Sequence, residues 1–238
     1  MNDLFLRAVR LDRSEESLRG SWVWSIPALR GPDRLELHKS VTFLTGENGS
    51  GKSTLLEAIA AALGLCPEGG TQNYRLSGCG DGSGLERAAR LERGFRRPKK
   101  TCFLRAESFY NVATAAATEY QDGSMPDYHA RSHGESFLDF IQDNRVPGLW
   151  LMDEPEAALS PQRQLTLMAL IDRMAREGSQ FLIATHSPLL TALPGAEILS
   201  LDGEGIRAVR YEETGCYRVT RMFMEQRDKM LRTLLEED

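Results

Sequence analysis

The chain has 238 residues, a formal net charge of −5, 41% hydrophobic and 26% charged residues, a composition typical of a globular protein with one sizeable α/β core. No apolar run approaches the ~18 residues needed to cross a bilayer, and the N-terminus lacks the form of a secretory signal. We therefore expect a cytoplasmic protein with no membrane insertion. The four cysteines have no metal-ligand spacing, which favours free thiols in a reducing compartment.

Two strands are predicted close to the N-terminus. Residues 4–11 and Trp22–Ile26 are short runs of apolar, β-branched and aromatic residues, and Pro27 ends the second run.

The glycine-rich segment that follows is the strongest motif in the chain. It reads GENGSGKST and fits the phosphate-binding pattern G-x-x-x-x-G-K-[ST]. The glycines let successive N–H groups point at phosphate oxygens, Lys52 would reach the β- and γ-phosphates, and Ser53 could ligate Mg²⁺. An apolar strand over 40–45 precedes the loop and a helix over 55–63 follows it, which disfavours a chance glycine turn. The predicted nucleotide-binding residues are Gly46, Glu47, Asn48, Gly49, Ser50, Gly51, Lys52, Ser53 and Thr54.

A basic segment follows a stretch of glycine-rich loops over 64–84. It contains Arg87, Arg90, Arg93, Arg96, Arg97, Lys99 and Lys100, with Glu86 and Glu92 between them. The steps of three and four residues predict a helix with one basic face. A solvated helix face is the simpler interpretation, and a contact with a phosphate backbone or a partner protein is the alternative. The net negative charge argues against a nucleic-acid footprint over the whole surface.

Three further strands are predicted after the basic segment, over 101–106, 146–152 and 181–185. The middle one leads into Asp153 and Glu154. Beside a phosphate-binding loop, Asp153 would hold Mg²⁺ and Glu154 would orient or deprotonate the attacking water. A strand ending in an acidic turn is common, so the pair gains its meaning from the glycine loop.

The C-terminal segment predicts a short β-like run over Tyr217–Thr220 and then an amphipathic helix, because apolar residues recur at helical spacing between 222 and 235. We expect this helix to pack on its own core, with docking of a partner as the alternative.

Together these motifs resemble the ATP-binding-cassette ATPases. Asp153-Glu154-Pro155 is similar to the family's Mg²⁺ aspartate, catalytic glutamate and proline. Residues 157–160 lie where the D-loop follows, with Ser160 in place of the usual aspartate. His186 falls at the place of the switch histidine, which the resemblance implies contacts the γ-phosphate, although a surface or capping histidine is the alternative.

Two motifs depart from the family pattern. Residues 131–135 occupy the place of L-S-G-G-Q, where Ser132 and Gly134 match and Glu135 replaces glutamine. The resemblance implies that these three residues bind the ATP held by an opposite subunit, whereas a polar loop capping a helix is the alternative. Glu107 is the nearest counterpart of the Q-loop glutamine, and it would be either a Mg²⁺ ligand, with its charge offset by Arg105, or purely structural.

The resemblance implies an α/β P-loop fold with a mixed central sheet, N-terminal antiparallel strands and a small helical subdomain over 107–145 inside a single domain over 1–238. The chain has no heptads, so it lacks the coiled-coil arms of the DNA-repair and chromosome-maintenance relatives. It looks most like minimal stand-alone bacterial ATPases of the AAA type. In the family an N-terminal aromatic flanks adenine; Trp22 or Trp24 could do so, although core packing is favoured.

The expected function is Mg²⁺-dependent ATP binding and hydrolysis coupled to head-to-tail homodimerisation, which would switch a nucleic-acid-related partner or an effector protein such as a nuclease. The catalytic residues would be Lys52, Glu154 and His186, and the metal ligands Ser53, Asp153 and Glu107. Two alternatives are the energising subunit of a membrane transporter and a nucleotide-sensing module with little turnover.

Overall fold

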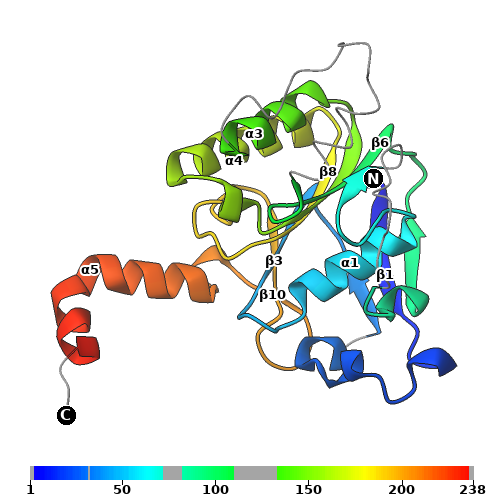
Figure 1. Ribbon diagram of the computed structural model, residues 1–238, viewed down its shortest axis with the longest axis horizontal. Coiled ribbons are helices and arrows are strands. Elements are labelled where there is room, and N and C mark those ends of the chain that lie inside the picture. The colour runs from blue at the N-terminus through cyan, green and yellow to red at the C-terminus, as the bar shows by residue number, and fades with distance from the viewer. Residues whose placement is uncertain (1–2, 32, 72–81, 110–132, 236–238) are drawn as a thin grey trace.

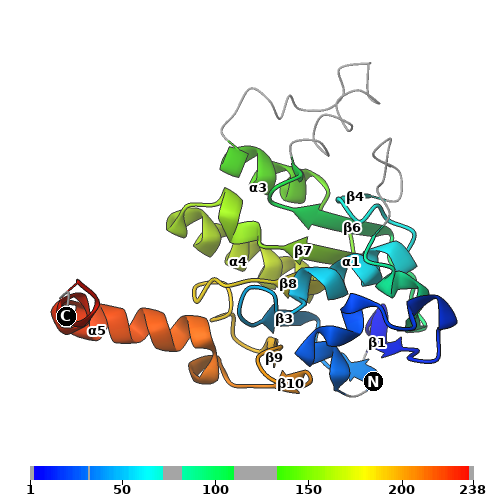
Figure 2. The same ribbon diagram turned by 60° about the horizontal axis from the view of Figure 1, so that its bottom comes forward.

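The structure is a computed structural model that describes residues 3–31, 33–71, 82–109 and 133–235. It contains a seven-stranded mixed sheet and a three-stranded antiparallel sheet, with helices packed on both faces of the larger sheet (Figures 1 and 2). The predicted α/β fold with a mixed central sheet and N-terminal antiparallel strands is confirmed.

The central sheet has the strand order β10-β9-β3-β8-β7-β6-β4. Its five inner strands are parallel, and the two edge strands pair antiparallel to their neighbours. The carboxyl ends of the inner strands therefore meet at one edge, where ligands bind in open α/β sheets. The strands are β3 (Val41–Thr45), β4 (Gly70–Thr71), β6 (Lys100–Arg105), β7 (Gly148–Asp153), β8 (Gln180–Ala184), β9 (Glu197–Ser200) and β10 (Arg207–Ala208).

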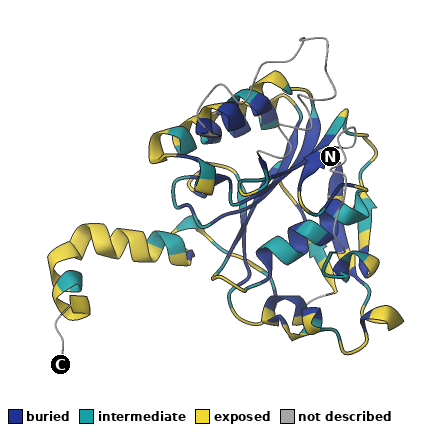
Figure 3. Ribbon diagram, viewed as in Figure 1, coloured by how far each residue is buried: buried dark blue, intermediate teal, exposed yellow. Residues whose placement is uncertain are grey.

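Two apolar clusters hold the helices against this sheet. In β7 the side chains alternate, so Leu149 and Leu151 join the cluster that contains α1 (Lys52–Ala62), whereas Trp150 and Met152 join the cluster beneath α3 (His133–Asp143) and α4 (Pro161–Arg176). A strand that is buried on both faces is typical of a parallel sheet covered by helices. Figure 3 shows the resulting buried centre.

The antiparallel sheet consists of β1 (Leu6–Leu11) between β2 (Arg34–Glu36) and β5 (Ala89–Arg93). The predicted strand over Trp22–Ile26 is wrong, because this segment forms the 3₁₀ turns η2 (Trp22–Ser25) and η3 (Pro27–Arg30). The Ser21 hydroxyl accepts a hydrogen bond from the Val23 N–H (3.5 Å), which caps the first turn, and Pro27 starts the second.

The basic segment is also a strand rather than the predicted helix. After a turn at η4 (Leu85–Arg87), β5 pairs with β1 and places Leu91 opposite Val9 on the buried face. Pairing with β1 outweighs the helical spacing of the arginines. Gly94 ends the strand, and its N–H donates to the Phe5 carbonyl (2.9 Å).

The C-terminal helix α5 (Gly215–Leu235) begins earlier than predicted, so the expected β-like run over Tyr217–Thr220 is wrong. The Thr214 hydroxyl accepts a hydrogen bond from the Tyr217 N–H (3.4 Å) and caps the helix. No residue of α5 is buried, and Figures 1 and 3 show it projecting from the body of the molecule. The expectation that it packs on its own core is therefore wrong.

Three shorter 3₁₀ turns complete the described elements: η1 (Glu16–Leu18), η5 (Pro155–Ala158) and η6 (Tyr211–Glu213). Most of the predicted subdomain over 107–145 lies outside the described residues.

Cys102 and Cys216 are free thiols, whereas Cys66 forms a disulfide bond, so the expectation of four free thiols is wrong. Within the described part of the chain, no helix has the length and apolar character needed to span a membrane.

Candidate functional site

The site lies where the inner strands of the central sheet end. The glycine-rich loop leaves the carboxyl end of β3, Asp153 ends β7, and His186 follows β8. Arg105 ends β6, and Asp202 lies two residues after the end of β9. Because these strands are neighbours, residues that are far apart in sequence converge at one edge of the sheet.

The loop from Gly46 to Gly51 wraps the N-terminus of α1. Gly49 and Gly51 have φ angles of 80° and 99°, a left-handed conformation that glycine adopts without strain. A Cβ at Gly51 would also lie 2.8 Å from the Cγ2 atom of Ile26. The loop therefore needs glycine here for backbone and packing reasons, and it presents the N-terminal amides of α1 as an anion site.

Lys52 is the first residue of α1, and its side chain folds back into the loop. Its Nζ donates to the carbonyl oxygens of Gly46 (2.7 Å) and Glu47 (3.1 Å). Burial lowers the pKa of Lys52, and the negative charges of Glu154 and Asp153 oppose that shift. A cation held inside a ring of loop carbonyls is positioned to exchange them for phosphate oxygens.

Ser53 and Asp153 form the pair that could hold a metal. The Ser53 hydroxyl donates to Oδ1 of Asp153 (3.0 Å) across the gap between α1 and β7, and Nε of Arg105 lies 3.5 Å from Oδ2. Burial raises the pKa of Asp153 to about 6, against the Arg105 charge and the Ser53 hydrogen bond. A hydroxyl and a carboxylate are the hard oxygen ligands that Mg²⁺ takes beside nucleotide phosphates, so the donor set fits that ion.

Glu154 and His186 form a second pair beside the first. Glu154 has a φ of 47°, the one positive φ of a described non-glycine residue, and its N–H donates to the Ala184 carbonyl (2.9 Å). A left-handed residue of this kind is often found at a functional site. Its Oε1 lies 3.6 Å from Nε2 of His186. This Nε2 is buried and has no hydrogen-bond partner among the described residues.

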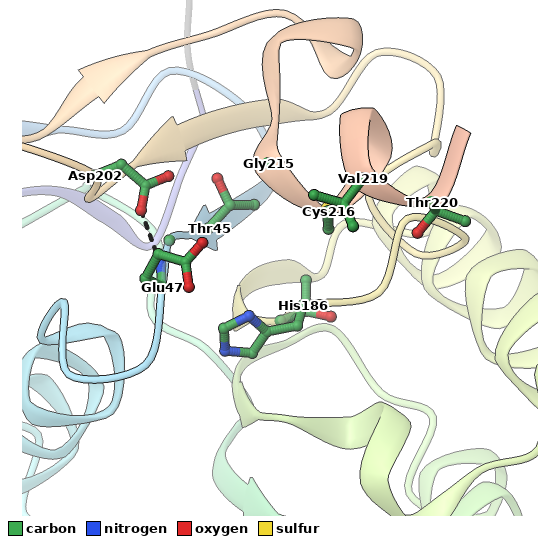
Figure 4. Close-up of a pocket in the computed structure, with 10 residues that line it drawn as sticks. Thr45, Glu47, His186, Asp202, Gly215, Cys216, Val219 and Thr220 are labelled. Carbon is green, nitrogen blue, oxygen red and sulfur yellow. Dashed lines mark hydrogen bonds between the residues drawn. The ribbon is translucent and has the colours of Figure 1, made fainter. Parts of the chain in front are cut away.

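A cavity of about 270 Å³ opens beside this histidine. Figure 4 shows Thr45 from the end of β3, Glu47 from the loop, and His186 and Asp202 around it, with the first turns of α5 on the far side. Oδ1 of Asp202 accepts a hydrogen bond from the Glu47 N–H (2.8 Å), which fixes the start of the loop. The cavity thus joins the loop, the end of β8 and α5.

Other predicted site residues lie elsewhere. Glu107 is exposed two residues after β6, and no described hydrogen bond or ion pair joins it to Ser53 or Asp153. Its assignment as a metal ligand stays a prediction. Gly134 and Glu135 begin α3; Glu135 pairs with Arg163 (2.7 Å), and a Cβ at Gly134 would lie 2.9 Å from the Ala158 carbonyl. Ser132 lies outside the described residues.

Sequence reasoning missed two positioning residues and the contacts of a third. Arg105, named in the sequence only for its charge beside Glu107, pairs with Glu57 (2.5 Å) and approaches Asp153 (3.5 Å). Glu156 accepts a hydrogen bond from the His186 N–H at Oε1 (2.6 Å), and Asp202 holds the loop. The available signal for Asp202 was the apolar run Ile198-Leu199 shortly before it; a polar residue just beyond the end of a parallel strand is a candidate in itself.

Comparison with known proteins agrees with this geometry. The family described as "AAA domain" matches residues 25–108, and the family described as "AAA domain, putative AbiEii toxin, Type IV TA system" matches residues 137–192. The cytochrome c biogenesis ATP-binding export protein CcmA of Rhizobium johnstonii is 31% identical over 169 residues, which cover 61% of this chain and 75% of that protein. CcmA of Rickettsia conorii is 27% identical, covering 70% and 90%.

Among solved structures, the SMC head domain from Thermotoga maritima aligns over 87% of this chain and 98% of its own, with 13% identity and a TM-score of 0.47. The fold, the glycine loop and the similarity to the Rhizobium relative define an ATP-hydrolysing P-loop enzyme. The chain belongs to the ATP-binding-cassette type of these ATPases.

Proposed function

We propose that the protein binds Mg²⁺-ATP, dimerises head to tail around two nucleotides, and reopens on hydrolysis to switch a partner. The observation that carries this proposal is the convergence of Ser53 with Asp153, and of Glu154 with His186, beside one glycine loop. Each pair supplies a separate part of phosphoryl-transfer chemistry, namely metal binding and activation of water.

In this proposal each side chain has one task. Lys52 and the loop amides hold the β- and γ-phosphates, and Ser53 and Asp153 hold the metal. Bound Mg²⁺ would neutralise charge that develops on the phosphate oxygens. Glu154 accepts the proton of the attacking water. The unpartnered Nε2 of His186 lies 3.6 Å from Glu154, where it can hold the water and the γ-phosphate in line.

The dimer is proposed from the resemblance in the segment around α3. Gly134 and Glu135 lie in the first turn of this helix, and the Glu135 side chain is half exposed. In a head-to-tail dimer this start of α3 would face the nucleotide of the second copy, where helix amides and a serine hydroxyl bind phosphate.

Glu154→Gln tests the dimer. The variant should keep ATP binding and accumulate the closed dimer, because the amide cannot accept the proton of water. Gel filtration with ATP and Mg²⁺ should show a dimer for Glu154→Gln, and a monomer when ATP is omitted. Glu177→Gln, at the exposed end of α4, is the matched control and should behave like the wild type. A monomer of Glu154→Gln under saturating ATP rules out the sandwich.

The partner we propose is nucleic-acid-related or an effector protein. The match of residues 137–192 to the toxin-type AAA family supports this choice. The second candidate, an energising subunit of a membrane transporter, is supported by the export-protein names of the two relatives. The ATPase rate with and without DNA, at two salt concentrations, separates them: stimulation by DNA supports the first candidate. A rate near zero with tight ATP binding would instead indicate a nucleotide-sensing module.

A further inference from the structure

Arg105 and Asp153 form the centre of a charged cluster at the carboxyl edge of the central sheet. They are the last residues of β6 and β7 and lie directly opposite each other on these parallel strands. The guanidinium Nε lies 3.5 Å from Oδ2 of Asp153, while Oδ1 of the same carboxylate accepts the Ser53 hydrogen bond. Both oxygens of the candidate metal ligand are therefore engaged, one by a hydroxyl and the other by a cation.

The same guanidinium also contacts a second carboxylate. Nη1 of Arg105 donates to Oε1 of Glu57 (2.5 Å) and to the Pro67 carbonyl oxygen (3.3 Å). Glu57 lies one turn after Ser53 on α1, and residues four apart share one face of a helix. The contacts thus form a closed chain that starts and ends on α1 and runs through Ser53, Asp153, Arg105 and Glu57.

The surroundings make these charge contacts strong. The side chains of Arg105 and Glu57 are 21% and 22% exposed, and that of Asp153 is 5% exposed. Partly buried charges are little screened by salt, and an unpaired charge there is costly. With two carboxylate partners, the guanidinium keeps one when it gives up the other. A cavity of about 380 Å³ beside Arg105 and Glu57 leaves the side chain room to move away from Asp153.

We propose that Arg105 is a positioning residue that competes with Mg²⁺ for the Asp153 carboxylate. The inference rests on the metal site proposed above and deepens it. In metal-free protein the guanidinium neutralises Asp153, and when the metal is bound the guanidinium pairs with Glu57 alone. Two cations at one carboxylate repel each other, so Mg²⁺ binds well only when the nucleotide phosphates add their negative charge. Arg105 thereby couples binding of the metal to binding of ATP.

The alternative is a purely structural ion pair that links β6 to α1. The two interpretations predict opposite signs for Arg105→Gln. Loss of a structural link loosens the site, so metal and nucleotide would both bind more weakly. Loss of a competing cation strengthens metal binding, and it weakens ATP binding only where no metal shields the phosphates from Asp153. A link to α1 needs only the contact with Glu57, so the additional approach to Asp153 favours competition.

Electron paramagnetic resonance of free Mn²⁺, used in place of Mg²⁺, tests the competition on nucleotide-free, full-length protein at about pH 8. Arg105→Gln should bind Mn²⁺ about tenfold more tightly than the wild type, because a positive charge beside the ion is removed. Arg105→Lys keeps the charge and should lie close to the wild type. Asp153→Asn in the Arg105→Gln background should abolish the gain. Arg173→Gln, which breaks a surface pair with Glu177 on α4, is the matched control.

Titration calorimetry of ATP in the presence of EDTA gives a second readout. Arg105→Gln should bind metal-free ATP about tenfold more weakly, since the Asp153 charge then acts on the phosphates without a counter-ion. Its affinity for Mg²⁺-ATP should be no lower than that of the wild type. Adding Asp153→Asn to Arg105→Gln should restore the binding of metal-free ATP.

Glu57→Gln tests the second partner and leaves Arg105 in place. Without Glu57 the guanidinium pairs with Asp153 alone, so Mn²⁺ binding in the presence of ATP should weaken about threefold, the size expected for one partly exposed ion pair. Tighter Mn²⁺ binding by this variant would contradict the proposed exchange of partners.

Three results would overturn the role of Arg105: Mn²⁺ binding by Arg105→Gln no tighter than in the wild type, the same gain in Arg105→Lys, or equal losses of ATP affinity with and without Mg²⁺. Failure of the metal site itself is distinguishable, because Asp153→Asn would then leave the Mg²⁺ dependence of ATP binding unchanged. Metal binding that depends on Asp153 but not on Arg105 refutes this inference alone.

Discussion

The nucleotide site and the outer face of the antiparallel sheet use charge in opposite ways. At the nucleotide site Lys52 and Asp153 are 4% and 5% exposed, and each is held by hydrogen bonds to the glycine loop or to Ser53. On the sheet face Arg34 and Arg90 are exposed, and they form ion pairs with Glu92 and Glu15. Buried charges interact strongly and are little screened, whereas exposed charges are individually weak and sensitive to salt.

The comparison implies that single substitutions at the nucleotide site have the largest effects. Glu154→Gln should lower the ATPase rate by about 10² to 10⁴, the usual contribution of a general base. Steady-state phosphate release measures this effect, with Glu177→Gln as the control. A turnover close to that of the wild type would remove Glu154 from the proposed chemistry.

A smaller effect is expected from Gly51→Ala. The added Cβ would sit at a left-handed φ of 99° and 2.8 Å from Ile26, so the loop must shift away from its phosphate-binding geometry. We expect ATP affinity to fall by about tenfold to a hundredfold, at a strain cost of about 1–3 kcal/mol. Gly203→Ala is the control, because its φ is 90° and nothing lies within 4 Å of the added Cβ. Equal ATP affinity for both variants would contradict the close fit of the loop.

The smallest effect concerns stability and pH. Burial raises the pKa of the Asp153 carboxyl to about 6 from an ordinary 3.8. The protonated carboxyl therefore stabilises the folded state below pH ~4, and this stabilisation is lost as the pH rises through 6 and the carboxyl ionises. In nucleotide-free protein, Asp153→Asn should therefore be more stable than the wild type by about 2 kcal/mol near pH ~8 and no more stable near pH ~4. Urea denaturation at both pH values measures the difference. Asp172→Asn, on α4, is the control, and the same dependence in both variants would contradict a local origin at Asp153.

Much of the fold and part of the site could be predicted because their signals are local. The buried run Val41–Thr45, the glycine loop and the helix after it form one continuous stretch of sequence. The strand that ends at Asp153 is likewise one continuous run of its own. Each strand has a continuous apolar run, which is typical of parallel strands buried on both faces. The convergence of Ser53 with Asp153 then follows from neighbouring strand ends.

The errors occur where distant contacts decide the structure. The arginines of β5 have helical spacing, but pairing with β1 makes the segment a strand. Trp22–Ser25 has the residues of a strand, but the Ser21 cap and Pro27 favour short turns. Asp202 and Glu156 act through hydrogen bonds to the Glu47 and His186 amides, which span 155 and 30 residues and leave no pattern in the sequence.

The central claim is that Lys52 and the glycine loop hold the triphosphate. Titration calorimetry of Mg²⁺-ATP into the wild type and into Lys52→Ala tests it most directly. Loss of a charge-assisted contact to the phosphates predicts that the affinity of the variant falls by at least about a hundredfold, or about 2.7 kcal/mol. An affinity of Lys52→Ala equal to that of the wild type, with the variant still folded by circular dichroism, would contradict the account.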